Sequence, residues 1–112
     1  MFFKHLAYIR GVNSKPRVLK AFEALDQAIQ EQIKLAYPEG FEDHLIRFTN
    51  KEGVYQSGLP FETDDKYYLV KMTRDEAQEL IAEDDDYDDD GNLKDDVKEE
   101  YEEKHEGEDQ DD

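Results

Sequence analysis

The sequence has no cysteine among its 112 residues, and this absence excludes several kinds of site. Neither a disulfide framework nor a thiolate metal site nor a cysteine nucleophile is available. Long apolar runs are lacking too, because no stretch approaches the roughly 20 residues that a helix needs to span a bilayer. The segment 1–9 is interrupted by Lys4 and His5 and does not have the pattern of a secretory signal. We therefore expect a cytoplasmic protein without membrane association.

A catalytic signature is also missing. The histidines, His5, His44 and His105, lie in unrelated segments, and no serine or threonine has the surroundings of a nucleophile elbow. Glu42 and Asp43 stand beside His44, but such a loop cluster is more typical of a solvated surface than of an acid–base or metal site. We expect that the protein is not an enzyme and has no catalytic residues.

Negative charge is what the chain has in excess, with 31 acidic and 14 basic residues and a formal net charge of −17. Ten basic and ten acidic residues precede residue 74 and cancel. The remaining four basic and 21 acidic residues all follow Thr73 and account for the whole net charge. This division predicts a neutral folded part with a strongly anionic C-terminal end.

One segment, 14–37, has the apolar spacing of a long amphipathic helix. Its apolar residues recur every three or four positions and so form one stripe: Val18, Phe22, Leu25, Ile29, Ile33 and Ala36. Ser14 or Asn13 can cap its start, and the Pro38 to Gly40 stretch that follows is typical of a helix end. We predict one helix over 14–37 that packs on a sheet.

The segment 41–72 has the pattern of a three-stranded antiparallel meander, with strands over 45–50, 54–59 and 66–72. Gly53 can adopt the left-handed conformation of a hairpin turn, and Pro60 is expected to end the second strand. We expect one face of this sheet to pack against the long helix through a set of apolar residues: Ile46, Phe48, Tyr68, Val70 and Met72.

Three further segments complete the prediction. Thr73 and Glu76 form a capping box that begins another helix. The apolar residues of the segment 2–9 fit the spacing of a helix slightly better than that of a strand, and we predict a helix there. From residue 84 onward, apolar residues are too few to offset the entropy of ordering the chain. The sequence thus predicts an α+β domain over 1–83, with a long helix on a three-stranded meander plus a further helix, followed by an acidic and mostly disordered tail over 84–112.

A basic patch lies at the start of the predicted long helix and is made of four residues: Arg10, Lys15, Arg17 and Lys20. Cations beside free N–H groups and the positive end of a helix dipole suit a phosphate or carboxylate. The patch is therefore a candidate anion-binding site, and the alternative is a solvated turn with ordinary surface cations.

Within the tail, the segment 86–93 resembles the first eight positions of an EF-hand calcium loop. Side-chain oxygens stand at alternate positions, and Gly91 occupies the place of the glycine that allows the sharp bend. The implied calcium ligands are Asp86, Asp88, Asp90 and Asn92. The segment departs from the pattern at Lys94 and at Val97, where the bidentate glutamate belongs.

These observations favour a non-enzymatic interaction or regulatory protein whose anionic tail engages a basic protein partner. The first alternative is a calcium-binding protein that uses the loop 86–97, with calcium as its one possible cofactor. The second is a nucleic-acid mimic, which requires carboxylates held at phosphate-like spacing on a rigid surface. Direct binding of nucleic acid is not expected.

Overall fold

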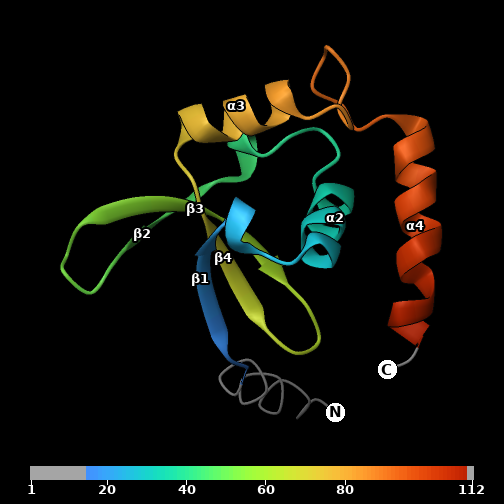
Figure 1. Cartoon of the computed structure of the whole chain (residues 1–112). Coiled ribbons are helices and arrows are strands. Elements are labelled where there is room, and N and C mark those ends of the chain that lie inside the picture. Colours follow the sequence, from blue (N-terminus) through green and yellow to red (C-terminus); the bar gives the residue numbers. More distant parts are fainter. Residues whose placement is uncertain (1–14, 111–112) are drawn as a thin grey trace, which may run out of the picture.

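The computed structural model describes residues 15–110, with side chains placed up to His105. In this part of the chain, a four-stranded mixed sheet and three α-helices form an α+β fold, which confirms the predicted class (Figure 1). The elements are β1 (Arg17–Ala21), the 3-10 turn η1 (Phe22–Ala24), α2 (Gln27–Ala36), the 3-10 turn η2 (Glu42–His44), β2 (Ile46–Thr49), β3 (Tyr55–Glu62), β4 (Tyr67–Lys71), α3 (Arg74–Glu83) and α4 (Asp95–Gln110). The predicted helix at 2–9 lies outside the described residues.

The single long helix predicted over 14–37 is wrong in its first half. Strand β1 occupies its start and pairs in parallel with β4, so that the strand order is β1-β4-β3-β2. The chain then turns through η1, and helix α2 begins only at Gln27. The side chain of Gln30 donates to the carbonyls of Phe22 and Leu25, both at 3.0 Å, which ties the turn to the helix. Pairing with a strand distant in sequence thus outweighs the local helical pattern.

The meander over β2, β3 and β4 is confirmed, with Gly53 at φ 81° in the hairpin turn. The prediction that Pro60 ends the second strand is wrong, because β3 continues to Glu62. Strand β2 pairs with β3 only as far as Gly58, so Pro60 lies where β3 has a neighbouring strand on one side alone. Proline is tolerated there, since an N–H that faces away from the neighbouring strand needs no partner.

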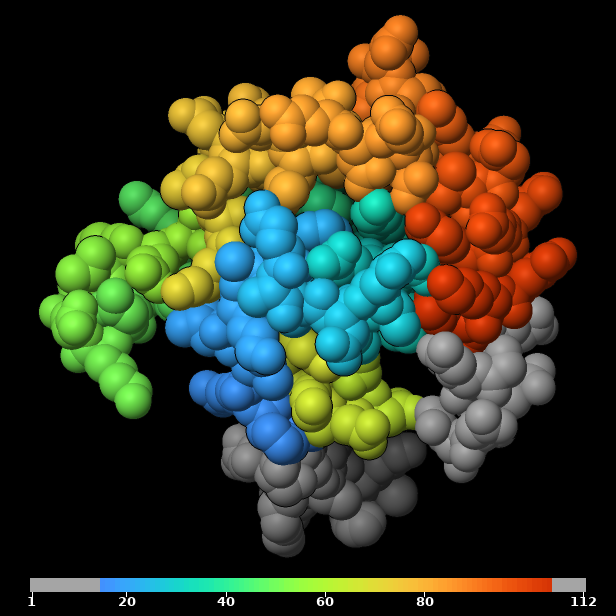
Figure 2. Space-filling model, viewed as in Figure 1, coloured from blue at the N-terminus to red at the C-terminus, as the bar shows by residue number. Residues whose placement is uncertain are grey.

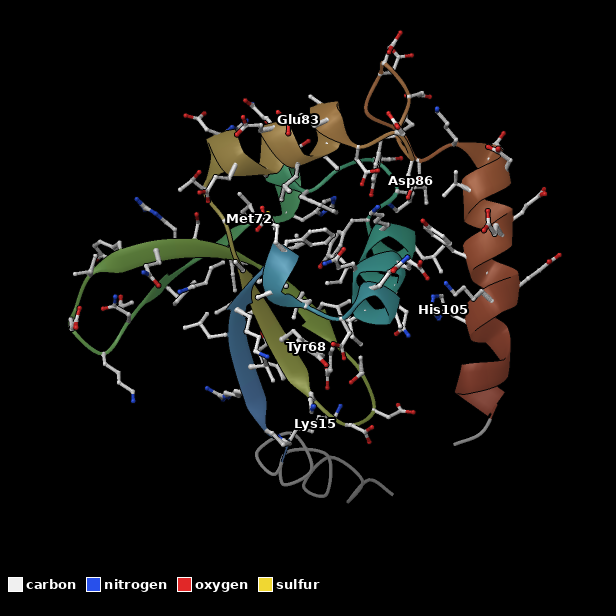
Figure 3. All side chains as sticks on the ribbon, viewed as in Figure 1. Lys15, Tyr68, Met72, Glu83, Asp86 and His105 are labelled. Atoms are coloured by element: carbon white, nitrogen blue, oxygen red, sulfur yellow. The ribbon has the colours of Figure 1, made fainter. Side chains whose placement is uncertain are left out.

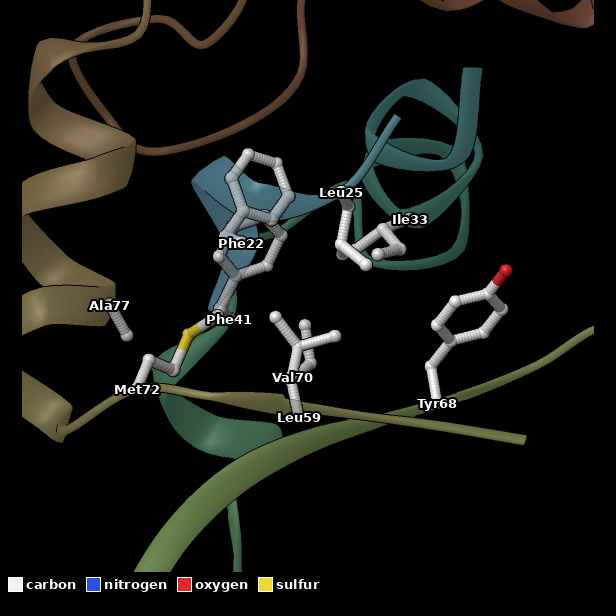
Figure 4. Close-up of a cluster of buried hydrophobic side chains, with 9 residues drawn as sticks. All are labelled: Phe22, Leu25, Ile33, Phe41, Leu59, Tyr68, Val70, Met72 and Ala77. Carbon is white, nitrogen blue, oxygen red and sulfur yellow. The ribbon is translucent and has the colours of Figure 1, made fainter. Parts of the chain in front are cut away.

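The core lies between the sheet, η1, α2 and α3 (Figure 4). Tyr68, Val70 and Met72 are buried in it as predicted. Ile46 and Phe48 are not part of this core, because Ile46 is 41% exposed and Phe48 is half-buried. The rest of the core comes from the segment predicted as the long helix, from the predicted second strand, from the helix that Thr73 caps and from Phe41: Phe22, Leu25, Ile33, Leu59, Ala77 and Phe41.

Helix α3 begins with the predicted capping box. The Glu76 N–H donates to Thr73 Oγ1 at 3.0 Å, and the Thr73 N–H donates to Glu76 Oε1 at 2.9 Å. Two N–H groups at the helix start are thereby satisfied, and the helix lies across one end of the sheet (Figure 1).

Beyond residue 83 the structure describes a loop and a further helix, and the predicted division into a domain over 1–83 and a tail over 84–112 stays a prediction. A tight loop, closed by a bridge between Tyr87 and Leu93, leads into the 16-residue helix α4. Both residues of the bridge are 5% exposed, and the ring of Tyr87 lies 6.2 Å from that of Phe41. Helix α4 then packs beside α2 (Figure 2). The few apolar residues of this segment are concentrated where they contact the body, so they order more chain than their number suggests.

Candidate interaction surface on α3 and α4

Helix α4 is joined to α2 by a buried carboxylate. Glu31 in α2 is 3% exposed, and its Oε1 lies 2.9 Å from both Lys104 Nζ and His105 Nε2. Gln27 Nε2 donates to Glu31 Oε2 at 3.1 Å. Burial acts to raise the pKa of Glu31, but the hydrogen bonds from Lys104, His105 and Gln27 outweigh it and lower the pKa below its ordinary value. We call these four residues the Glu31 cluster; Figure 3 shows His105 on the side of α4 that faces α2.

A second group of charges lies near the N-terminal part of α4. Lys34 Nζ is 2.6 Å from Asp84 Oδ2 and 2.9 Å from Asp86 Oδ2, and the Tyr101 hydroxyl donates to Asp86 Oδ2 at 2.6 Å. Burial acts against the charged forms of Lys34 and Asp86. The contacts with Asp84 and Asp86 nevertheless raise the pKa of Lys34, and the bonds from Tyr101 and Lys34 lower the pKa of Asp86. The pKa of Tyr101 is raised by burial and by its bond to Asp86. These residues form the Lys34 cluster, which fixes the loop and α4 to α2.

With α4 held in this way, its outward side and the neighbouring elements present many carboxylates to solvent. Exposed acidic side chains of α3, the loop and α4 make up what we call the anionic surface: Asp75, Glu76, Glu79, Glu83, Asp85, Asp88, Asp89, Asp90, Asp95, Asp96, Glu99, Glu100, Glu102 and Glu103. The exposed cations Arg74, Lys94, Lys98 and Lys104 offset only a small part of this charge. The C-terminal excess of negative charge therefore lies on a structured surface.

The residues with EF-hand-like spacing are placed as follows. Asp86 is bound to Lys34 and Tyr101. Asp88 Oδ1 accepts the N–H groups of Asp90 and Asn92, each at 2.9 Å, and Gly91 has the expected positive φ of 84°. Among the described residues, no group of three or more His, Cys, Asp or Glu side chains is arranged to hold a metal ion. Calcium binding here stays a prediction, and it would compete with the ion pair between Asp86 and Lys34.

The structure separates the predicted anion-binding residues. Lys15 pairs with Glu62 and donates to the Thr63 carbonyl at 3.0 Å. Arg17 and Lys20 lie in β1, three positions apart, so they point to opposite faces of the sheet. Helix α2 begins only at Gln27, and Lys20 lines one surface depression with Asp26, the residue that precedes the helix. Anion binding here stays a prediction. Arg10 lies outside the described residues.

Sequence reasoning missed the Glu31 and Lys34 clusters. Glu31 meets His105 across 74 positions of the chain, and Lys34 meets Asp86 across 52. Glu31 and Lys34 lie at positions that are typical of the solvated face of a helix, so the sequence near them contains no signal for either cluster. Of the residues that were considered for catalysis, Glu42 pairs with Arg74 at 3.0 Å and His44 is exposed beside the ring of Tyr37.

Comparison with protein-family models, with curated proteins and with solved structures finds no match to this chain. No helix in the described part of the chain is long and apolar enough to cross a membrane. The function must therefore be argued from the surface itself.

Proposed function

We propose that the protein is a non-enzymatic interaction or regulatory protein that binds a basic protein partner through the anionic surface. The observation that supports this most directly is the docking of α4, because it holds exposed carboxylates on a defined surface instead of a flexible chain. A surface of one charge sign steers a partner of the opposite sign and suppresses wrong partners. Ordering the carboxylates in advance also reduces the entropy lost on binding.

The test compares two triple variants that remove the same charge from different places. The surface variant carries Glu99→Gln, Glu102→Gln and Glu103→Gln, and the matched control carries Glu52→Gln, Asp64→Asn and Asp65→Asn in the turns of the sheet, all at exposed positions. Proteins retained from a cell lysate at low salt would be identified, and the affinity of one purified partner would then be measured. We expect the surface variant to weaken binding and to reduce its salt dependence, while the control binds like the unaltered protein.

Two results would count against the proposal. Equal loss of affinity in both triple variants would mean that only net charge matters and that the surface has no specific role. Failure of the unaltered protein to retain any basic protein at low salt would reject the interaction itself.

Nucleic-acid mimicry is a second proposal, and the regular helix α4 is the observation that favours it. The Cβ atoms of residues three or four positions apart on a helix lie about 5–6 Å from one another, and the acidic residues 95, 96, 99, 100, 102 and 103 follow this spacing. Such a row suits the basic groove of a nucleic-acid-binding protein. If so, duplex DNA or RNA should displace the partner at an ionic strength where an uncharged competitor does not. Retained partners without any affinity for nucleic acid would contradict mimicry but not the broader proposal.

A further inference from the structure

The sheet has a second face, opposite to the core, that carries apolar residues. Leu19 in β1 lies directly beside Leu69 in β4, and Arg17 lies beside Tyr67 in the same register. These positions alternate with Val18 and Tyr68, which point to the core, so they share the other face. Leu19 is 47% exposed, whereas Leu69 and Tyr67 are half-buried. This face is therefore apolar and accessible.

The apolar residues line a shallow, open groove. The groove has a volume of about 460 Å³, and its walls come from β1, β4, β2 and the β2–β3 turn. Strands β1 and β2 are the two edges of the sheet, so both can line one groove only if the sheet and its hairpin curve around it. Phe48 belongs to this groove, which explains why it is half-buried without being part of the core.

Charged residues stand at the rim of the groove. Arg17 comes from β1 on one side, and Lys51 comes from the hairpin turn on the other. Glu52, beside Lys51 in the turn, also lines it, so two cations and one carboxylate leave a small positive excess. This excess contrasts with the net charge of −17 of the whole chain. An apolar floor with a cationic rim is complementary to a molecule that has an apolar body and an anionic head.

We propose that this groove binds a small amphiphilic carboxylic acid, with its chain on Leu19, Leu69 and Phe48 and its carboxylate at Arg17. A guanidinium suits this role because its planar donors match a carboxylate in a bidentate arrangement. The size of the groove favours a small molecule over a protein. Ligand pockets usually measure about 300–1,000 Å³, whereas a stable protein interface uses about 20–30 residues on each side; ten described residues line this groove.

The site is distinct from the anionic surface, and so the two proposals can fail separately. The probe is decanoate below its micelle concentration, at about 0.15 M salt, where the Debye length of about 8 Å screens charges elsewhere on the protein. Decyltrimethylammonium, with the same chain and the opposite charge, serves as the matched ligand. Amide shifts in two-dimensional NMR spectra of the full chain would report where each binds.

We expect decanoate to shift the amides of 17–19, 48–52 and 67–69 with a saturable response, and the ammonium compound to bind at least several-fold more weakly. Arg17→Gln should weaken decanoate binding by about twofold to fivefold, since an exposed charge pair contributes up to about 1 kcal/mol and each 1.4 kcal/mol is tenfold. Leu19→Ser should weaken both amphiphiles. The matched controls are Arg47→Gln and Val54→Ser, which change an exposed cation and an exposed apolar residue outside the groove.

Three results would overturn the proposal. The first is the absence of saturable shifts at millimolar decanoate. The second is equal affinity for the two amphiphiles, which would mean that the rim does not recognise the anion. The third is an equal effect of Arg17→Gln and Arg47→Gln, which would place the recognition elsewhere. Arg17→Gln and Leu19→Ser change exposed side chains and are not expected to disturb folding. Unchanged amide signals from the core residues in the NMR spectrum would verify this.

Discussion

Replacing Glu31 with glutamine tests how α4 is attached to the body. Glu31 is 3% exposed and lies 2.9 Å from both Lys104 and His105. The substitution keeps the shape and an acceptor oxygen but removes the charge that those partners face. Hydrogen bonds to a charged group contribute about 1.5–3 kcal/mol each when buried. The side chain of Lys104 is 51% exposed, so its share is reduced by solvent. We therefore expect Glu31→Gln to lower the free energy of unfolding by about 1–2 kcal/mol.

Urea unfolding and thermal melting of the full chain would measure this loss, and a change of 1 kcal/mol shifts the melting temperature by about 4–8 °C in a domain of this size. The matched control is Glu39→Gln, at an exposed position. Removing one negative charge from a protein of net charge −17 should otherwise relieve repulsion and be neutral or slightly stabilising. Glu31→Gln is thus expected to lower the free energy of unfolding, whereas Glu39→Gln should leave it unchanged or raise it slightly. Indistinguishable stabilities, or unchanged amide exchange protection in α4, would refute the attachment through Glu31.

Acid should release α4, because the pKa values of Glu31 and Asp86 are lowered in the folded protein. Their contribution is present above the ordinary carboxyl pKa of about 4 and is lost as the pH falls through the folded values, so the stability difference between the unaltered protein and Glu31→Gln should shrink there. A stability difference that does not shrink in acid would contradict this expectation. The raised pKa of Lys34 has the opposite effect, because its contribution is present below pH about 10.4 and is lost as the pH rises further; a stability difference between the unaltered protein and Lys34→Met that does not shrink at high pH would contradict it. Deletion of 84–112 should leave a domain that unfolds cooperatively but is less stable by about 3–6 kcal/mol, since the two buried apolar side chains of this segment, Tyr87 and Leu93, are lost. Loss of the cooperative urea transition would show that the division at residue 83 is wrong. Calcium, if it binds, should shift 86–93 before other acidic segments and less in Gly91→Ala; equal shifts with magnesium throughout the acidic residues would mean nonspecific binding.

Local signals made part of the fold predictable. The capping box of Thr73 and Glu76 determines where α3 begins, and strand-forming residues around Gly53 determine the hairpin. Both depend on residues a few positions apart, which a sequence pattern can represent.

The missed features depend on distant contacts. Val18, Phe22 and Leu25 have helical spacing, yet β1 is a strand because β4 is available as a parallel neighbour. The acidic composition after residue 83 was recognised, but the roles of Tyr87 and Leu93 depend on Phe41 and on the Pro38 carbonyl, which accepts the Leu93 N–H at 2.7 Å. The sequence thus predicts the negative charge of the anionic surface, but it does not predict that helix α4 is docked on the body.

The parallel pairing of β1 with β4 also constrains the order in which the protein folds. Arg17 meets Tyr67 only after 50 further residues have been made, whereas β2, β3 and β4 are joined by short turns. Closing a long loop costs more entropy than closing a short one, and sheets with distant pairings form slowly. During synthesis, β1 therefore leaves the ribosome first among the four strands, and it is the last that can join the sheet. Until then one edge of β4 stays open to pairing with another chain.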